Sequence, residues 1–287
     1  MNKMDYKLLN LCFKDKESIF SYFATKGKVL DCSDLTKRRV FIDNGGSVLF
    51  VGHLDTVLPP KIHKMTANTI VAQGLDDRLG LYVILTLLKS GVKADVLLTD
   101  GEESAKSTAK YHNLKNYNWV CEFDRGGTDF VSYGLANKDL KNILSQTWPE
   151  GVGSFTDICF FKTEIACFNL GIGYHQAHGK NSYVKIMDVE NQIEKFKTFY
   201  VKNSGIAFKQ DGTDFDNWLS CDVCGSVWEV KPIHGYNVCK DCIEKFIGIA
   251  DNPVRCDNCG GERCASYDEN SDSHLCTDCR EYIYGAF

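Results

Sequence analysis

Cysteine is distributed very unevenly along this chain. Nine of its 14 cysteines lie within residues 221–279, and eight of these nine form C-x-x-C pairs. The first residues (MNKMDYKLLN) contain no long apolar run, so we expect no signal peptide and a cytoplasmic protein. In that setting, paired thiols at this spacing favour metal ligation over disulfides. We therefore expect the C-terminal segment to fold around metal ions and the preceding residues to form an apolar core.

The spacing of the pairs predicts the kind of metal module. Fourteen residues separate the first two pairs and 16 separate the last two, which is typical of zinc ribbons. Each C-x-x-C turn supplies two thiolates to a tetrahedral zinc. We expect two sequential ribbons over 219–248 and 249–287, with cross-braced pairing as the alternative. The predicted structural zinc ligands are Cys221, Cys224, Cys239, Cys242, Cys256, Cys259, Cys276 and Cys279.

The charge of this tail indicates which partner it suits. Residues 219–287 contain 12 Asp or Glu and 6 Lys or Arg, and each zinc held by four thiolates adds further negative charge. Phosphate binding requires the opposite sign. The formal net charge of the chain is -5, which also argues against a nucleic-acid or membrane-surface protein. We expect the ribbons to dock a protein or peptide.

Apolar runs that suit strands alternate with helical patterns between residues 47 and 202. This alternation predicts an α/β fold, expected as a three-layer sandwich with a mostly parallel central sheet. The expected strands are 47–52, 94–99, 117–123, 128–133 and 165–171. The expected helices are 79–90, 103–112, 137–147 and 188–202, the last with Asp188 as its N-cap. Ligands in such folds bind beyond the carboxyl ends of the strands.

The periodic pattern stops near residue 205. Residues 206–218 (IAFKQDGTDFDNW) are polar and lack a period, so we expect a domain over 1–205 followed by a linker over 206–218. No stretch of the sequence reaches the ~18 apolar residues that a membrane-spanning helix needs.

Five segments carry acidic or histidine residues just after an apolar strand or at the start of a helix. In order, they are GHLDTV (52–57), GLDDRLG (74–80), TDGEESA (99–105), EFDRGG (122–127) and YHQAHGKNSYV (174–184). Each segment alone is a weak signal, because such residues are common in turns and on solvated faces. Together they suit a pair of divalent metals, which needs a bridging carboxylate, outer ligands on each metal and a free carboxylate as general base.

The order of these segments resembles the co-catalytic dizinc exopeptidases, a family that includes peptidase T, acetylornithine deacetylase and glutamyl aminopeptidase relatives. The resemblance covers roughly residues 47–200. It implies His53, Asp76, Glu103, Asp124 and His178 as metal ligands, with Asp76 bridging the two metals. It also implies that Glu102 is the general base, that Asp55 orients His53, and that Asp77 neighbours the bridge. Gly80 would let the following helix pack closely.

Further residues enter through the same resemblance. The segment GSFTDICFF (153–161) resembles a turn near the family's active site, which implies supporting roles for Thr156 and Asp157. The family's final motif usually has glutamate where this chain has Ser182, and His175 is the alternative to His178 as last ligand. Only 53 residues separate Asp124 from His178, which leaves no room for the lid or dimerisation domain that many relatives insert there.

These observations predict a metal-dependent hydrolase. We expect an exopeptidase that removes N-terminal residues from short peptides, with two active-site divalent metals and two structural zinc ions as cofactors. Zinc is the expected active-site metal, and carboxylate ligands also admit manganese or cobalt. Two alternatives stay open: a deacylase acting on a non-peptide amide, and an interaction protein whose catalytic half is vestigial.

Overall fold

The computed structural model describes residues 4–153, 155–211, 230–233, 236–240, 242–243, 266–268 and 273–275. The chain divides into two compact units, Met1–Trp218 and Leu219–Phe287. The candidate site residues of the predicted hydrolase all lie in the first unit. Within the described residues, no helix has the length and apolar character that crossing a membrane requires.

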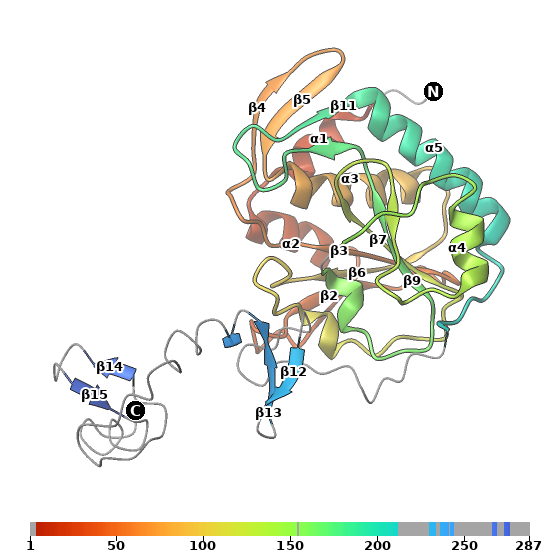
Figure 1. Cartoon of the computed structure of the whole chain (residues 1–287). Coiled ribbons are helices and arrows are strands. Elements are labelled where there is room, and N and C mark those ends of the chain that lie inside the picture. Colours follow the sequence, from red (N-terminus) through yellow and green to blue (C-terminus); the bar gives the residue numbers. More distant parts are fainter. Residues whose placement is uncertain are drawn as a thin grey trace. The chain divides into compact units, whose positions relative to one another are not determined.

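A seven-stranded sheet forms the centre of the first unit (Figure 1). Its spatial order is β1-β2-β6-β3-β7-β9-β8. The strands are β1 (Lys28–Leu30), β2 (Arg39–Ile42), β3 (Leu49–His53), β6 (Asp95–Thr99), β7 (Val120–Arg125), β8 (Phe130–Val131) and β9 (Cys167–Gly171). The four central strands β6, β3, β7 and β9 are parallel, and the outer pairings are antiparallel. The expected α/β fold with a mostly parallel sheet is therefore confirmed.

Helices cover one face of this sheet. They include α1 (Tyr6–Cys12), α3 (Leu75–Lys89) and α5 (Ile186–Asn203), and α3 packs against β3, β7, α1 and α5. An aromatic cluster fills the space between the sheet and α5, with Phe123 and Phe196 ring centroids 4.9 Å apart. The cluster also contains Phe50, Trp119, Phe168 and Phe199. Such interlocked rings fix the position of each strand relative to α5.

Close packing of α3 on β7 depends on Gly80. A Cβ atom at this position would lie 2.2 Å from the carbonyl oxygen of Phe123, so any other residue would push the helix away from the sheet. This confirms the close approach expected for Gly80. The contact matters for function because the first turn of α3 carries Asp76 and Asp77.

Short elements cover the opposite face. Successive residues of a strand point to opposite sides, so Glu122 faces away from the side that Phe123 shares with α5. On the Glu122 side, η2 (Asp157–Phe160) contacts β3, β7, β9 and η1 (Thr108–Tyr111). The remaining helices of this unit are α2 (Lys16–Ala24), which contacts β2, and α4 (Lys138–Leu144).

A second, smaller sheet lies beside the first turn of α3. Its order is β10-β11-β5-β4, and all its pairings are antiparallel. The strands are β4 (Lys61–Met65), β5 (Thr69–Gln73), β10 (Tyr174–His175) and β11 (Tyr183–Lys185). This sheet therefore holds the chain on both sides of His178, which lies between β10 and β11.

Three local expectations were wrong. The helix expected over 103–112 is absent, and only the short η1 forms there, because φ is +80° at Gly101 and +55° at Ala105. The helix expected from 79 starts four residues earlier, at Leu75. Asp188 is not an N-cap, because α5 begins at Ile186 directly after β11 and the cap position is Lys185.

The segment expected as a linker begins as part of the first unit. Phe208 is buried, its amide donates to the carbonyl of Asn118 (2.8 Å), and its own carbonyl accepts from Ala166 (3.0 Å). Lys209 forms a bridge with Ile165. Residues 206–211 thus extend the folded unit, and any linker starts beyond residue 211.

A pair of truncations tests this boundary. A chain that ends at residue 211 should keep the thermal stability of the first unit. One that ends at residue 205 should lose about 3 kcal/mol, because the Phe208 side chain leaves the core. For a unit of this size, that loss corresponds to a decrease of about 10 °C in Tm. Equal Tm values for the two truncations in thermal melts would show that residues 206–211 contribute nothing.

In the second unit, the structure describes two hairpins. Strands β12 (Val230–Ile233) and β13 (Tyr236–Cys239) pair antiparallel, as do β14 (Ser266–Asp268) and β15 (Ser273–Leu275). Cys239 ends β13, and the Cys242 side chain is buried just after it. The other predicted zinc ligands, Cys221, Cys224, Cys256, Cys259, Cys276 and Cys279, lie outside the described residues. The two zinc ribbons therefore stay a prediction.

Candidate metal centre

The predicted site residues meet at one edge of the central sheet. His53 is the last residue of β3, Asp124 lies near the end of β7, and Glu102 and Glu103 follow β6. Because β6, β3 and β7 are parallel neighbours, their carboxyl ends reach the same edge. Segments that are up to 71 residues apart in sequence thereby converge.

Two other segments, one at the start of α3 and one between β10 and β11, complete the group of candidate site residues. Asp76 and Asp77 lie in the first turn of α3, which follows Gly74 in a left-handed conformation (φ +66°). His178 lies between β10 and β11 and also has a positive φ, of +57°. A left-handed histidine is uncommon and marks a turn that the surrounding structure imposes.

One part of the site pairs His53 with Asp124. The His53 side chain is 2% exposed, and its Nε2 atom lies 3.4 Å from Asp124 Oδ1. On the other side of the ring, Nδ1 lies 3.1 Å from the backbone oxygen of Asp55. A proton on Nδ1 satisfies that oxygen and leaves the lone pair of Nε2 facing Asp124. No described residue forms a hydrogen bond with Nε2, so a cation beside both atoms would resolve this arrangement.

The other part brings together Asp76, Glu103 and His178. The Nε2 atom of His178 lies 3.2 Å from Glu103 Oε2 and 3.6 Å from Asp76 Oδ2. The backbone amide of His178 also donates to Asp76 Oδ2. The second oxygen of Asp76, Oδ1, is buried and accepts no hydrogen bond from the described residues. Asp76 therefore offers one oxygen to the His178 side and keeps another free.

These donors fit divalent metal ions. Imidazole nitrogens and carboxylate oxygens are common zinc ligands, and two of these atoms (His53 Nε2 and Asp76 Oδ1) are buried without a hydrogen-bond partner among the described residues. Two three-residue groups, each with its ligand atoms within 4.8 Å of one another, share His53. One is His53, Glu102 and Asp124, and the other is His53, Asp77 and Glu103.

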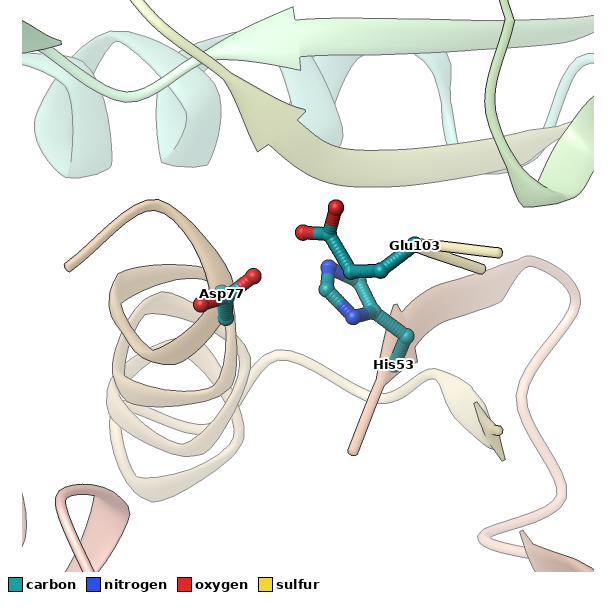
Figure 2. Close-up of side chains that lie close together, drawn as sticks. All are labelled: His53, Asp77 and Glu103. Carbon is teal, nitrogen blue, oxygen red and sulfur yellow. The ribbon is translucent and has the colours of Figure 1, made fainter. Parts of the chain in front are cut away.

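The second group contains Asp77, which is not among the metal ligands expected from the sequence. Figure 2 shows its carboxylate, at the start of α3, near the side chains of His53 and Glu103. Asp77 is 3% exposed, and neither of its side-chain oxygens has a hydrogen-bond partner within the part of the chain that the structure describes. Asp77 thus groups with His53 and Glu103, whereas the expected bridging residue, Asp76, contacts His178.

The carboxylates strongly perturb one another's pKa values. Burial, together with Asp124, raises the pKa of Glu102 to about 9. Burial also favours the protonated form of Glu103, but the contact with the His178 imidazole lowers its pKa to about 2. Burial opposes a charge on His53, yet the field of Asp124 raises its pKa well above 6.5. So many acidic groups in one enclosed space can all be ionised only with cations among them.

Asp55 makes a contact that was not expected. Its carboxylate is 3.5 Å from His53 Nδ1, which is too long for a strong hydrogen bond. It accepts instead from the backbone amides of Glu102 (3.3 Å) and Glu103 (3.1 Å). The Asp55 side chain therefore holds the loop that carries both glutamates, whereas its backbone oxygen contacts His53.

The alternative ligand His175 lies apart from this group. Its side chain is exposed and stacks on Tyr183, with ring centroids 5.0 Å apart. Ser182, which stands where relatives usually have glutamate, is fully buried and donates to the carbonyls of Gln176 and Gly179. It stabilises the turn that contains His178.

Two further residues of the site escaped the sequence reasoning. The pairing of β7 with β9 shifts register between Glu122 and Arg125, and Asp124 lies in this irregularity. The Asn169 side chain fills the gap, because its Oδ1 accepts from the Asp124 amide and its Nδ2 donates to the Asp124 carbonyl (3.0 Å each). Glu122 is fully buried beneath the site, and burial with neighbouring carboxylates raises its pKa well above the usual value. A polar residue within an apolar run was the available signal for both residues.

Thr156 and Asp157 lie on the same side as Glu122. Both are fully buried. Thr156 Oγ1 accepts from Asn169 Nδ2 (3.3 Å), and the Asp157 carboxylate accepts from the hydroxyls of Thr99 and Ser107. These contacts place residues 156–158 next to the loop that carries Glu102 and Glu103.

No protein-family model and no curated protein matches this sequence. Solved structures do match its fold. One is the aminopeptidase PepT from Bacillus cereus, at 12% identity and a TM-score of 0.52, over 69% of this chain and 97% of that one. A tripeptidase from Staphylococcus aureus matches at 12% identity and 0.53, over 71% and 100%. An aminopeptidase from the archaeon Desulfurococcus kamchatkensis matches at 14% and 0.52, over 68% and 93%. The first unit is thus similar in fold to solved aminopeptidases and a tripeptidase.

Proposed function

We propose that this chain is a two-metal aminopeptidase that removes N-terminal residues from short peptides. The observation that carries the proposal is the convergence of His53, Asp76, Glu103, Asp124 and His178 at one sheet edge. In this assignment His53 and Asp124 hold one ion, Glu103 and His178 hold the other, and Asp76 contacts both. Bound divalent ions would acidify a water molecule and stabilise negative charge on the attacked carbonyl oxygen.

Glu102 is the proposed general base. Its side chain is 8% exposed and groups with His53 and Asp124, yet the ligand set does not require it. A carboxylate in this position can take the proton of the attacking water and then give it to the leaving amine. The enclosed position also excludes bulk water, which strengthens the interaction of Glu102 with the reacting atoms.

Charge supports a substrate with a free amino group. The described carboxylates of the site and its surroundings outnumber the positive charges that two divalent ions and the buried Arg78 would supply. These seven carboxylates belong to Asp55, Asp76, Asp77, Glu102, Glu103, Asp124 and Asp157. The remaining negative field attracts an α-ammonium group and repels a carboxylate. This favours release of N-terminal residues over recognition of a C-terminus.

Because so few residues separate Asp124 from His178, we propose that loops, a partner subunit or the zinc modules supply substrate recognition. The described residues between Asp124 and His178 form β8, α4, η2, β9 and β10, all of which belong to the two sheets and their covering elements. They contain no additional folded domain. We therefore propose short peptides as substrates, because the described part of this segment adds no domain that could hold a longer chain.

A panel of matched peptides tests this proposal. The metal-loaded protein should release the N-terminal residue from di- and tripeptides with a free amino group. It should be inactive on the same peptides with acetylated N-termini, and a chelator should abolish the activity. Selective cleavage of the acyl-amide bond in the acetylated series would instead identify a deacylase. No cleavage of either series with zinc, manganese or cobalt would contradict both assignments.

The cysteine-rich unit adds a second part to the proposal. We propose that its four C-x-x-C pairs hold two structural zinc ions and that its acidic surface docks a protein or peptide. The spacing of the pairs and the charge of residues 219–287 support this role. Residues 212–218 are proposed as the linker.

A further inference from the structure

Hydrogen bonds between its two ends close the loop that carries Glu102 and Glu103. We define the base loop as residues 100–107, between the end of β6 and η1. At its neck, the Thr108 amide donates to the Asp100 carbonyl (2.8 Å), and the Asp100 amide donates to Thr108 Oγ1 (3.0 Å). Inside it, the amides of Ala105 and Lys106 donate to the carbonyls of Glu102 and Gly101 (2.8 Å each). The loop is therefore compact although it is not helical.

One buried carboxylate links both ends of this loop. Asp157 accepts a hydrogen bond from the Thr99 hydroxyl, just before the loop, and another from the Ser107 hydroxyl, at its end. All three residues are fully buried. Thr99 and Ser107 lie eight residues apart in sequence, and the Asp157 carboxylate spans them with one oxygen each.

The turn that contains Asp157 is itself fixed by a contact with β7. It opens η2, and the amide of the next residue, Ile158, donates to Glu122 Oε2 on β7 (3.4 Å). Glu122 thus fastens the η2 turn to the same strand that carries Asp124. The path Glu122, η2, Asp157 and Ser107 connects β7 to the base loop through enclosed contacts.

We infer that Asp157 is a positioning residue that fixes the base loop so that Glu102 reaches the attacking water. This inference rests on the proposed function. Hydrogen bonds to a buried carboxylate are strong and directional, so two of them at the loop ends restrict the loop. A base must lie within about 2.6–3.2 Å of the proton that it takes, and small displacements cost large factors in rate.

Removal of single hydroxyl groups tests the inference. Ser107→Ala deletes one donor to Asp157, and Thr99→Val deletes the other while keeping the side-chain shape. At saturating metal, each variant should lose about tenfold or more in kcat with little change in KM, because the base moves and the substrate contacts remain. Ser132→Ala is the matched control, since Ser132 is also buried and donates to a carboxylate, that of Glu150 (3.3 Å), away from the loop.

A double variant separates positioning from general destabilisation. In the Glu102→Gln background, Ser107→Ala should have no further effect on kcat, because the base on which it acts is gone. Equal losses in both backgrounds would overturn the inference. So would a folded Ser107→Ala or Thr99→Val variant with normal kcat.

Hydrogen exchange supplies a readout that does not need activity. Amides of residues 101–106 should exchange at least tenfold faster in Ser107→Ala and Thr99→Val than in Ser132→Ala. Faster exchange in a protein without peptidase activity would keep the role of Asp157 in holding the loop and reject the proposed function. Unchanged exchange in an active protein would reject the role of Asp157 and keep the function.

Discussion

Glu102→Gln is expected to lose turnover by about a hundredfold or more while it keeps both active-site metals. Glutamine preserves the shape and hydrogen-bonding capacity of the side chain but cannot accept a proton at neutral pH. Because Glu102 is not needed as a ligand, metal affinity and KM should stay close to those of the parent protein. Steady-state kinetics on the best peptide, together with metal analysis, measure both effects.

Glu103→Gln is the control for this prediction. Its side chain contacts His178, so the change should weaken one metal, and excess metal should restore part of the activity. Near-normal turnover in Glu102→Gln would contradict the assignment of the base. Loss of metal in Glu102→Gln but not in Glu103→Gln would show that the two roles are exchanged.

Asp76→Asn is expected to have the largest effect on metal binding. Asp76 is proposed to contact both ions, so its loss should weaken both by more than the ten- to hundredfold that is typical of an outer partner. Activity should fall below detection. Asp77→Asn should keep both ions, because the proposed ligand set is complete without it. Titration calorimetry with zinc on the two variants measures the difference.

The reverse result for the two variants would identify a different bridging residue. A carboxylate oxygen of Asp77 lies within 4.8 Å of ligand atoms of His53 and Glu103, and neither side-chain oxygen of Asp77 forms a hydrogen bond with another described residue. If Asp77→Asn lost the metals and Asp76→Asn kept them, the bridging role would belong to the second aspartate.

Strands β3, β6, β7, β8 and β9 were predictable because they lie in apolar runs bounded by polar residues, whereas the sequence did not predict β1, β2, β4, β5, β10 and β11. The start of α3 was not, because Leu75–Arg78 (LDDR) contains three charged residues, a pattern typical of a loop. These residues are buried all the same, since the site encloses Asp76 and Asp77. The expected helix over 103–112 failed for a related reason. Its residues favour a helix locally, but contacts with Asp55 and Asp157 hold them in a loop.

Three of the five segments converge because β3, β6 and β7 are parallel strands that end at one edge. The other two reach the site from the start of α3 and from the turn between β10 and β11. The resemblance to a known family supplied the individual roles, and those roles stay proposals. The sequence could not show that Asp55 contacts the Glu102–Glu103 backbone or that Asn169 supports Asp124, because both depend on side-chain orientation in the folded sheet. Neither partner is close in sequence to the residue that it supports.

Anomalous diffraction from zinc-loaded crystals tests the central claim most directly. The account predicts two zinc peaks about 3.5–4 Å apart at the edge of the central sheet. One peak should lie between His53 and Asp124, the other between Glu103 and His178, with Asp76 in contact with both. A single peak, or a pair of peaks held by other residues, would contradict the proposed two-metal centre.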